Sequence, residues 1–218
     1  MSRPSRAATL AGLAVVLVVL VGFVVVRAAD RPDAPARSAA PATTSPAPAS
    51  RAASPSPLRA ACPATARRFE PTSIDVLGVG RRIPVIAPPR DAGDVPGTPP
   101  LTATGKRVFA FDRGQGVEPG DRRGNVLLNA HTYPDGSALG NDLLLSTAKG
   151  DRVVVHGTGG RRLCYTVRSI TQVRASDGFP AYYAKDGRPQ LAIIVCSGRR
   201  LGPGDWESRT IFFASPGV

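Results

Sequence analysis

Residues 191–196, which read LAIIVC, decide the fold of this 218-residue chain. This is the most apolar short run in the C-terminal half, and Ser197 and Gly198 follow it directly. A short, β-branched apolar run that ends at turn-forming residues predicts a buried β-strand. Its last residue, Cys196, then stands where a rigid strand meets a loop, which is where reactive groups tend to be placed.

Two other polar residues flank strand-like runs in the same way. Arg209 lies thirteen positions after Cys196 and begins the run RTIFFA at residues 209–214. If the two runs pair as a hairpin, the thiol and the guanidinium meet at one edge of the sheet. His131, one of two histidines, follows the run NVLLNA at residues 125–130. Strand ends that carry Cys, His and Arg predict a thiol acyl-transfer site.

The rest of the C-terminal part alternates short apolar runs with Gly, Pro and Asp. Besides the three runs above, strands are expected at residues 73–77, 83–87, 107–111, 152–156 and 162–170. About eight strands at this spacing predict an all-β barrel or sandwich. A short helix is expected near residues 139–148, a helical turn at 180–184, and a loop over the Pro/Gly-rich residues 88–105.

The N-terminal segment is a separate feature of the chain. Residues 10–26 are seventeen uncharged, mostly apolar residues, with Arg3 and Arg6 before them and Arg27 after them. Such a run is just long enough to span a bilayer, and basic residues ahead of it favour a cytoplasmic N-terminus. We therefore expect residues 1–27 to be a cytoplasmic tip and a single-pass membrane anchor. A cleaved signal peptide is the alternative, and both place the remaining chain outside the membrane.

The composition and charge separate a linker from a folded domain. Residues 28–65 are rich in Ala, Pro, Ser and Thr, which predicts a disordered, semi-rigid stalk before a domain at residues 66–218. The net charge of +12 divides into +5 through residue 60 and +7 for the remainder. No helical motif or aromatic-rich basic strand accompanies this charge, so we expect no nucleic-acid partner. Attraction to an anionic cell envelope, or simply a soluble basic surface, explains the charge better.

The chain has three cysteines, an odd number for an exported protein. One disulfide and one free reactive thiol is the natural division. Cys62 stands at the entrance to the domain and Cys164 lies within the strand-like residues 162–167, so a bridge between them would leave Cys196 free. The alternative is three reduced thiols, with Cys164 as a small core residue. No C-x-x-C or H-x-x-x-H pair is present, so the sequence predicts no metal site and no cofactor.

Three residue types cover the requirements of thiol acyl transfer. A cysteine is nucleophilic as the thiolate, and a nearby histidine can take or return its proton. A guanidinium in a partly dry site stabilises the oxyanion that forms as the carbonyl is attacked. We assign these roles to Cys196, His131 and Arg209.

Each assignment has a plainer alternative. His131 could be a hydrogen-bonded core histidine. His156 precedes the Gly-rich turn GTGG, which indicates a solvated loop histidine rather than a catalytic one. Arg199 and Arg200 are closer to Cys196 in sequence than Arg209, but they fall in a Gly/Pro loop expected at residues 197–204, where long side chains are usually solvated.

On these residues the chain resembles the sortases. The likeness covers roughly residues 70–216, and it most resembles the actinobacterial sortases of classes E and F. The segments that carry it are LNAH at 128–131, LAIIVC at 191–196 and WESR at 206–209, together with residues 119–125 and 149–155. The resemblance implies an eight-stranded β-barrel, and a cysteine transpeptidase for surface proteins with a C-terminal LPXTG-like sorting signal.

The resemblance also implies how the residues would act. Cys196 would attack the carbonyl of the signal's threonine and form a thioester. His131 would protonate the departing amine and later deprotonate the incoming one. Arg209 would stabilise the oxyanion and hold the signal peptide. The amine of a cell-wall precursor, or of another surface protein such as a pilin, would then resolve the thioester.

The chain departs from the family pattern at two positions beside these residues. Val195 stands where Thr is common before the nucleophile, and Ala130 stands where Gly often precedes the histidine. We expect Val195, Trp206 and Asn129 to contact the substrate. Two other functions remain open: a thiol peptidase that only hydrolyses such signals, and a non-catalytic wall-binding barrel.

Overall fold

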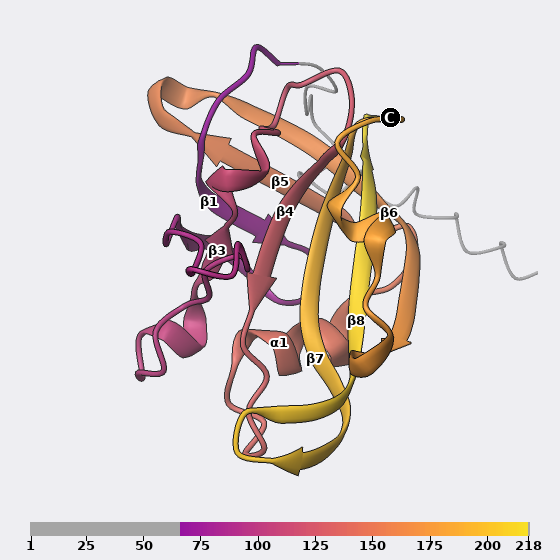
Figure 1. The fold of residues 1–218 in the computed structure, drawn as a ribbon. Helices are drawn as coiled ribbons and strands as arrows, with labels where there is room; N and C mark the ends of the chain where they lie inside the picture. The colour runs from indigo at the N-terminus through magenta and orange to yellow at the C-terminus, as the bar shows by residue number, and fades with distance from the viewer. Residues whose placement is uncertain (1–65, 218) are drawn as a thin grey trace, which may run out of the picture. The chain divides into compact units, whose positions relative to one another are not determined.

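The computed structural model describes residues 66–217, which form a closed eight-stranded β-barrel with one α-helix (Figure 1). The strands are β1 (Pro71–Val76), β2 (Gly80–Ile86), β3 (Phe109–Phe111), β4 (Asn125–Ala130), β5 (Arg152–Gly157), β6 (Arg162–Arg174), β7 (Gln190–Gly202) and β8 (Asp205–Pro216). Around the barrel they follow the order β1-β2-β3-β4-β7-β8-β6-β5. The predicted all-β barrel is confirmed.

The helical segments are short. The helix α1 (Leu139–Ser146) lies between β4 and β5, near its predicted position, and the predicted helical turn is the 3-10 segment η6 (Pro180–Tyr183). The other 3-10 turns are η2 (Gly105–Arg107), η3 (Arg113–Gln115), η4 (Thr158–Gly160) and η5 (Ala175–Asp177). No helix within residues 66–217 is long and apolar enough to cross a bilayer. The predicted anchor at residues 10–26, the predicted stalk and Cys62 lie outside the described residues.

The centre of the barrel wall is a parallel pair of strands. β4 and β7 pair from Asn125↔Gln190 to Ala130↔Val195. Every residue of β4 is buried, as expected for a strand that is covered on both of its faces. Strands of this kind are continuous apolar runs in sequence, and both β4 and β7 could therefore be predicted as strands.

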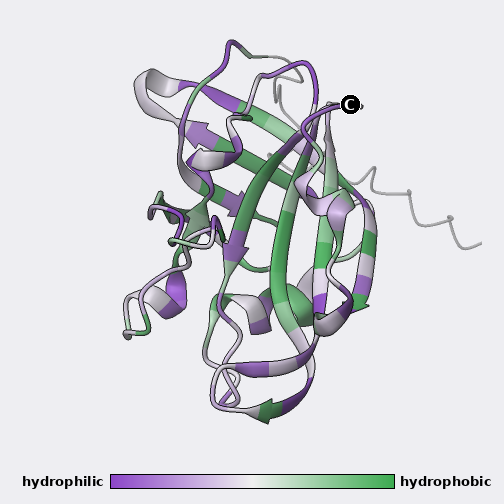
Figure 2. Ribbon diagram, in the orientation of Figure 1, coloured by the Kyte–Doolittle hydropathy of each residue, from purple (hydrophilic) through white to green (hydrophobic). Residues whose placement is uncertain are grey.

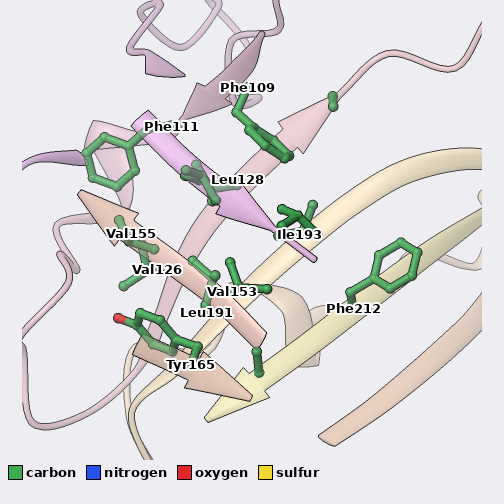
Figure 3. Close-up of a cluster of buried hydrophobic side chains, with 14 of the residues drawn as sticks. Phe109, Phe111, Val126, Leu128, Val153, Val155, Tyr165, Leu191, Ile193 and Phe212 are labelled. Atoms are coloured by element: carbon green, nitrogen blue, oxygen red, sulfur yellow. The ribbon is translucent and has the colours of Figure 1, made fainter. Parts of the chain in front are cut away.

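Two apolar clusters cover the two faces of this wall. The barrel interior holds the larger cluster, which includes Leu128, Leu191, Ile193, Phe212 and the aromatic rings of β3 (Figure 3). On the outer face, a smaller cluster packs beneath the connection between β6 and β7; its buried members are Leu127, Tyr182, Ala192, Ile211 and Phe213. Because side chains alternate along a strand, the outer face also carries the polar residues at the strand ends.

The hairpin of β7 and β8 is longer than the sequence indicates. Residues 197–204 were expected to form a loop, but β7 continues to Gly202 and β8 starts at Asp205. The extension pairs only with itself, and its register shifts between Ser197 and Arg200. In Figures 1 and 2 it forms a ribbon beyond the barrel, where the hydrophobic colour of β7 gives way to polar residues. The glycines that predicted a loop therefore lie in the irregular part of the β7–β8 hairpin.

His156 was expected to be a solvated loop histidine, and this prediction is wrong. It belongs to β5 and is 6% exposed. Its Nε2 lies 3.1 Å from Asp75 Oδ2, without hydrogen-bond alignment. The strand β5 continues one residue past His156, to Gly157, before the Gly-rich turn begins. His156 is therefore part of the sheet, and its imidazole is enclosed beside β1.

Candidate functional site

The three residues proposed for catalysis lie directly after β4 and on its neighbours β7 and β8. Cys196 of β7 is the register partner of Arg209 of β8, and opposed side chains in such a pair have Cβ atoms about 5 Å apart. The ladder between β4 and β7 ends at Ala130↔Val195, so His131 and Cys196 both occupy the next position. Val195 points into the core, and alternation therefore directs Cys196 to the outer face.

A groove of about 660 Å³ opens over these three residues. Its lining includes His131, Cys196 and Arg209 together with many apolar and aromatic side chains. These come from the 88–105 segment (Val95, Pro96, Leu101), the η6 turn (Tyr182, Tyr183) and the β7–β8 hairpin (Pro203, Trp206). The charged side chains in the described lining are Arg200 and Arg209, and no carboxylate is among them. An uncharged or anionic peptide fits this groove better than a basic one.

Cys196 is the free cysteine of the described residues, and it is half-buried. Burial raises the pKa of its thiol; the nearby Arg209 lowers it and Asp205 raises it further, with a net shift upward. The thiol is therefore mainly protonated at neutral pH and needs a base to become a nucleophile. Cys164 is disulfide-bonded. Because Cys62 lies outside the described residues, its pairing with Cys164 stays a prediction.

Arg209 is held by backbone oxygens rather than by a carboxylate. Its Nη1 donates hydrogen bonds to the carbonyls of Trp206 (3.2 Å) and Ser208 (3.0 Å). Within residues 66–217 it forms no salt bridge, so its charge is not neutralised by a neighbour. This arrangement orients the guanidinium and leaves its other N–H groups to interact with an oxyanion or a substrate carbonyl.

Of the rival arginines, Arg200 lines the outer part of the groove, opposite Trp206, and Arg199 does not line it. Arg199 donates its backbone N–H to Glu207 Oε2. Neither of them is paired with Cys196, and so the register favours Arg209 for contact with the thiol.

The imidazole of His131 also has a fixed partner. Its Nε2 lies 2.6 Å from the carbonyl oxygen of Pro99, and because a carbonyl can only accept, Nε2 carries a proton and donates it. The ring packs edge-on against Tyr133, with ring centroids 5.9 Å apart. His131 is thus held at the groove by the loop that precedes β3, and it is half-buried rather than a core residue.

The loop that contacts His131 is anchored to the barrel at two points. Arg90 makes a bidentate pair with Asp112 (2.9 and 2.6 Å), a carboxylate that is only 2% exposed. Nearer the groove, Asn129 Nδ2 donates to the carbonyl of Gly97 at 2.9 Å. The sequence predicts the loop but not these contacts, because Asp112 and Asn129 are far along the chain from Arg90 and Gly97.

The three residues expected to contact substrate differ in what they present. Trp206 lines the groove from the hairpin, and Asn129 lines it while binding Gly97. Val195 borders the groove, but its side chain is 1% exposed and packs in the core. The absence of a threonine hydroxyl at this position therefore changes the core wall more than the open groove.

Thr132 is a residue that sequence reasoning missed. Its hydroxyl donates to the carbonyl of Cys196 at 2.7 Å. The only signal in the sequence was its place directly after His131, because a bond to a backbone oxygen leaves no trace in residue types.

Within residues 66–217, no group of three or more His, Cys, Asp and Glu side chains is placed to hold a metal ion.

Solved structures supply the comparison for this geometry. No family model matches the sequence, and a comparison with curated proteins gives no match. Sortase C1 from Streptococcus agalactiae superposes with a TM-score of 0.51 at 14% identity, over 67% of each chain. The pilus-related sortase C of Group B Streptococcus gives 0.50 at 16% identity, over 71% of this chain and 69% of that one.

Sortase C1 of Group B Streptococcus pilus island 1 gives a TM-score of 0.50 at 18% identity, over 66% of this chain and 64% of that one. The chain thus spans slightly less than two thirds of that neighbour's length. At these identities the likeness shows the fold. The described part of this protein has the sortase fold, as the sequence resemblance implied. The closer likeness to classes E and F stays a prediction.

Proposed function

We propose that this protein is a sortase-type cysteine transpeptidase that cleaves a C-terminal sorting signal and transfers the surface protein to an amine. The observation that carries the proposal is that His131 directly after β4, Cys196 on β7 and Arg209 on β8 lie under one groove. The fold supports the proposal, because the solved structures that share it are sortases.

The first half of the proposed reaction uses all three residues. His131 takes the proton of the Cys196 thiol, whose raised pKa keeps it protonated at rest. The sulfur attacks the peptide carbonyl, and Arg209 stabilises the oxyanion. The C–N bond then breaks, the amine leaves with the proton returned by His131, and the acyl group stays on sulfur as a thioester. With Nε2 donating to Pro99, Nδ1 is the imidazole nitrogen that can accept this proton.

The second half reverses these roles. An incoming amine loses its proton to His131 and attacks the thioester, and an amide forms as the thiolate leaves. The acceptor is the amine of a cell-wall precursor or of a pilin. We place the domain outside the cell, held by residues 10–26 in the membrane, because this uncharged run follows basic residues.

Incubation of the protein with a library of LPXTG-like peptides, with and without an added amine, tests the proposal. We expect a covalent acyl-enzyme by mass spectrometry, and an amide product when the amine is present. Cys196→Ala should give neither. Cleavage that yields only the free acid in every amine tested would favour a hydrolase, and no reaction with any peptide would favour a binding module.

A further inference from the structure

The segment that follows β4 carries the imidazole beyond the end of the parallel ladder. Its last register pair with β7 is Ala130↔Val195, so His131 has no ladder partner. A histidine that must exchange a proton with a thiol needs a fixed distance to it, because a shift of about 1 Å can cost a factor of about 100 in rate. A contact outside the ladder therefore has to fix the distance between His131 and Cys196.

The helix side of this segment is fixed by α1. Gly140 donates its backbone N–H to the His131 carbonyl at 2.7 Å. Asn141 binds both backbone groups of Tyr133: its Oδ1 accepts from the Tyr133 N–H and its Nδ2 donates to the Tyr133 carbonyl, each at 3.0 Å. These contacts hold the segment to the helix but do not connect it to the nucleophile.

Thr132 supplies the connection to the nucleophile. Its buried hydroxyl donates to the carbonyl of Cys196 itself, at 2.7 Å. The fit is tight, since a Cβ added at Gly140 would lie 2.5 Å from both the Thr132 hydroxyl oxygen and the His131 carbonyl oxygen. The hydroxyl therefore fills the space between helix, histidine segment and nucleophile strand.

We propose that Thr132 is a positioning residue: its hydroxyl ties the backbone of Cys196 to the residue after His131, so that imidazole and thiol keep one mutual geometry. The inference rests on the proposed thiol chemistry of this site, and it assigns Thr132 no contact with substrate. It acts through His131, and its effect should therefore vanish when the imidazole is absent.

The chain offers a matched control in Thr210. This threonine of β8 is also buried, and its hydroxyl also donates a hydrogen bond beside the nucleophile, to Ser197 Oγ at 2.9 Å. It opposes Val195 in the register and does not line the groove. Thr210→Val removes a comparable hydrogen bond without touching the link between Cys196 and the histidine segment.

The experiment measures alkylation of Cys196 by iodoacetamide as a function of pH, on the full chain, with the modified peptide identified by mass spectrometry. It needs no substrate, so it gives a result even if no sorting-signal peptide is cleaved. Wild type, Thr132→Val, Thr132→Ser and Thr210→Val are compared, each with His131 intact and with His131→Ala. Thermal melting of each variant separates loss of fold from loss of alignment.

We expect Thr132→Val to slow alkylation near neutral pH about tenfold and to shift its pH midpoint upward. The same change should alter the rate less than twofold when His131 is replaced by Ala. Thr132→Ser, which keeps the hydroxyl, and Thr210→Val should stay within twofold of wild type. The inference is overturned if Thr132→Ser is as slow as Thr132→Val, if Thr210→Val gives the same slowing, or if the effect persists without His131.

Discussion

The two histidines of this protein look alike in sequence and differ in the structure. Each comes at the end of an apolar run in a predicted strand. His131 leaves the barrel wall one residue after β4 and lies half-buried in a groove with Cys196 and Arg209. His156 stays within β5, buried against Asp75. A strand end becomes a site only where neighbouring strands end or pair beside it.

Replacing each histidine by alanine tests this comparison and should give the largest effect. His131→Ala should lower the rate of acyl-enzyme formation by about 10² to 10⁴, the usual contribution of a general acid–base, and leave thermal stability nearly unchanged. His156→Ala should keep the rate and lower the free energy of unfolding by about 1–3 kcal/mol, because it leaves the partly buried Asp75 without its neighbour. Stopped-flow or quenched kinetics and denaturant titration provide the two measurements.

The opposite pattern, with activity lost in His156→Ala and kept in His131→Ala, would break the comparison. A loss of activity in both variants at full stability would show that the groove does not define the site.

A second comparison is between Arg209, which is the register partner of Cys196, and Arg199, which is not. Arg209→Ala should lower kcat/KM by about 10² to 10³, since it removes the charge expected at the oxyanion. Arg209 also lowers the pKa of Cys196, so its removal should move the pH midpoint of thiol alkylation further upward. Arg199→Ala, two residues past Ser197 and outside the groove lining, should change both quantities less than twofold. Equal losses in the two variants would mean that register with Cys196 is irrelevant.

The pairing of His156 with Asp75 predicts a smaller, acid-dependent effect on stability. Burial alone would raise the pKa of Asp75, but the N–H of Arg82 and the neighbouring His156 lower it, and the net shift is downward. A carboxyl whose pKa is lowered by folding stabilises the protein fully above its ordinary pKa, about 3.9, and loses this contribution as pH falls through the lowered value. Asp75→Asn should therefore cost on the order of 1 kcal/mol at pH 7 and converge with wild type in strong acid. Parallel unfolding curves from pH 7 to pH 2 check this, and a constant difference at every pH would contradict it.

The smallest effect expected is at Asn129, and it separates two roles. If Asn129 mainly holds the loop through Gly97, Asn129→Ala should loosen the contact of Pro99 with His131 and speed alkylation of Cys196 a few-fold. If it instead binds substrate, as the sequence suggested, KM for peptide should rise and alkylation should not change. KM for the peptide and the alkylation rate of Cys196 are measured on the same preparation of Asn129→Ala.

Much of the barrel could be predicted from the sequence because its buried strands are continuous apolar runs. The stretches NVLLNA and LAIIVC became β4 and the first half of β7 at the expected residues. The extension of β7 could not be predicted, since its Gly residues, and Pro203 in the turn that follows, indicate loops unless a partner strand is known. The set of catalytic candidates could be guessed from strand ends, but its register is a long-range property.

Contacts to backbone oxygens were beyond reach for a different reason. The bonds from Thr132 to Cys196, from His131 to Pro99 and from Asn129 to Gly97 all end on carbonyls, which every residue has. Residue types at these positions therefore carry no signal of the contact. The partly buried pair of Arg90 and Asp112, twenty-two residues apart in sequence, could not be predicted, because it depends on how the loop packs on the barrel.

The central claim is that Cys196 carries the acyl group, with His131 and Arg209 beside it. The most direct test is to trap the reaction of wild-type protein with a sorting-signal peptide at low pH and to map the adduct by peptide mass spectrometry. We expect a hydroxylamine-labile thioester on the peptide that contains Cys196, and no adduct in the Cys196→Ala protein. Cleavage of the peptide with the acyl group on another residue, or undiminished cleavage by Cys196→Ala, would contradict the claim.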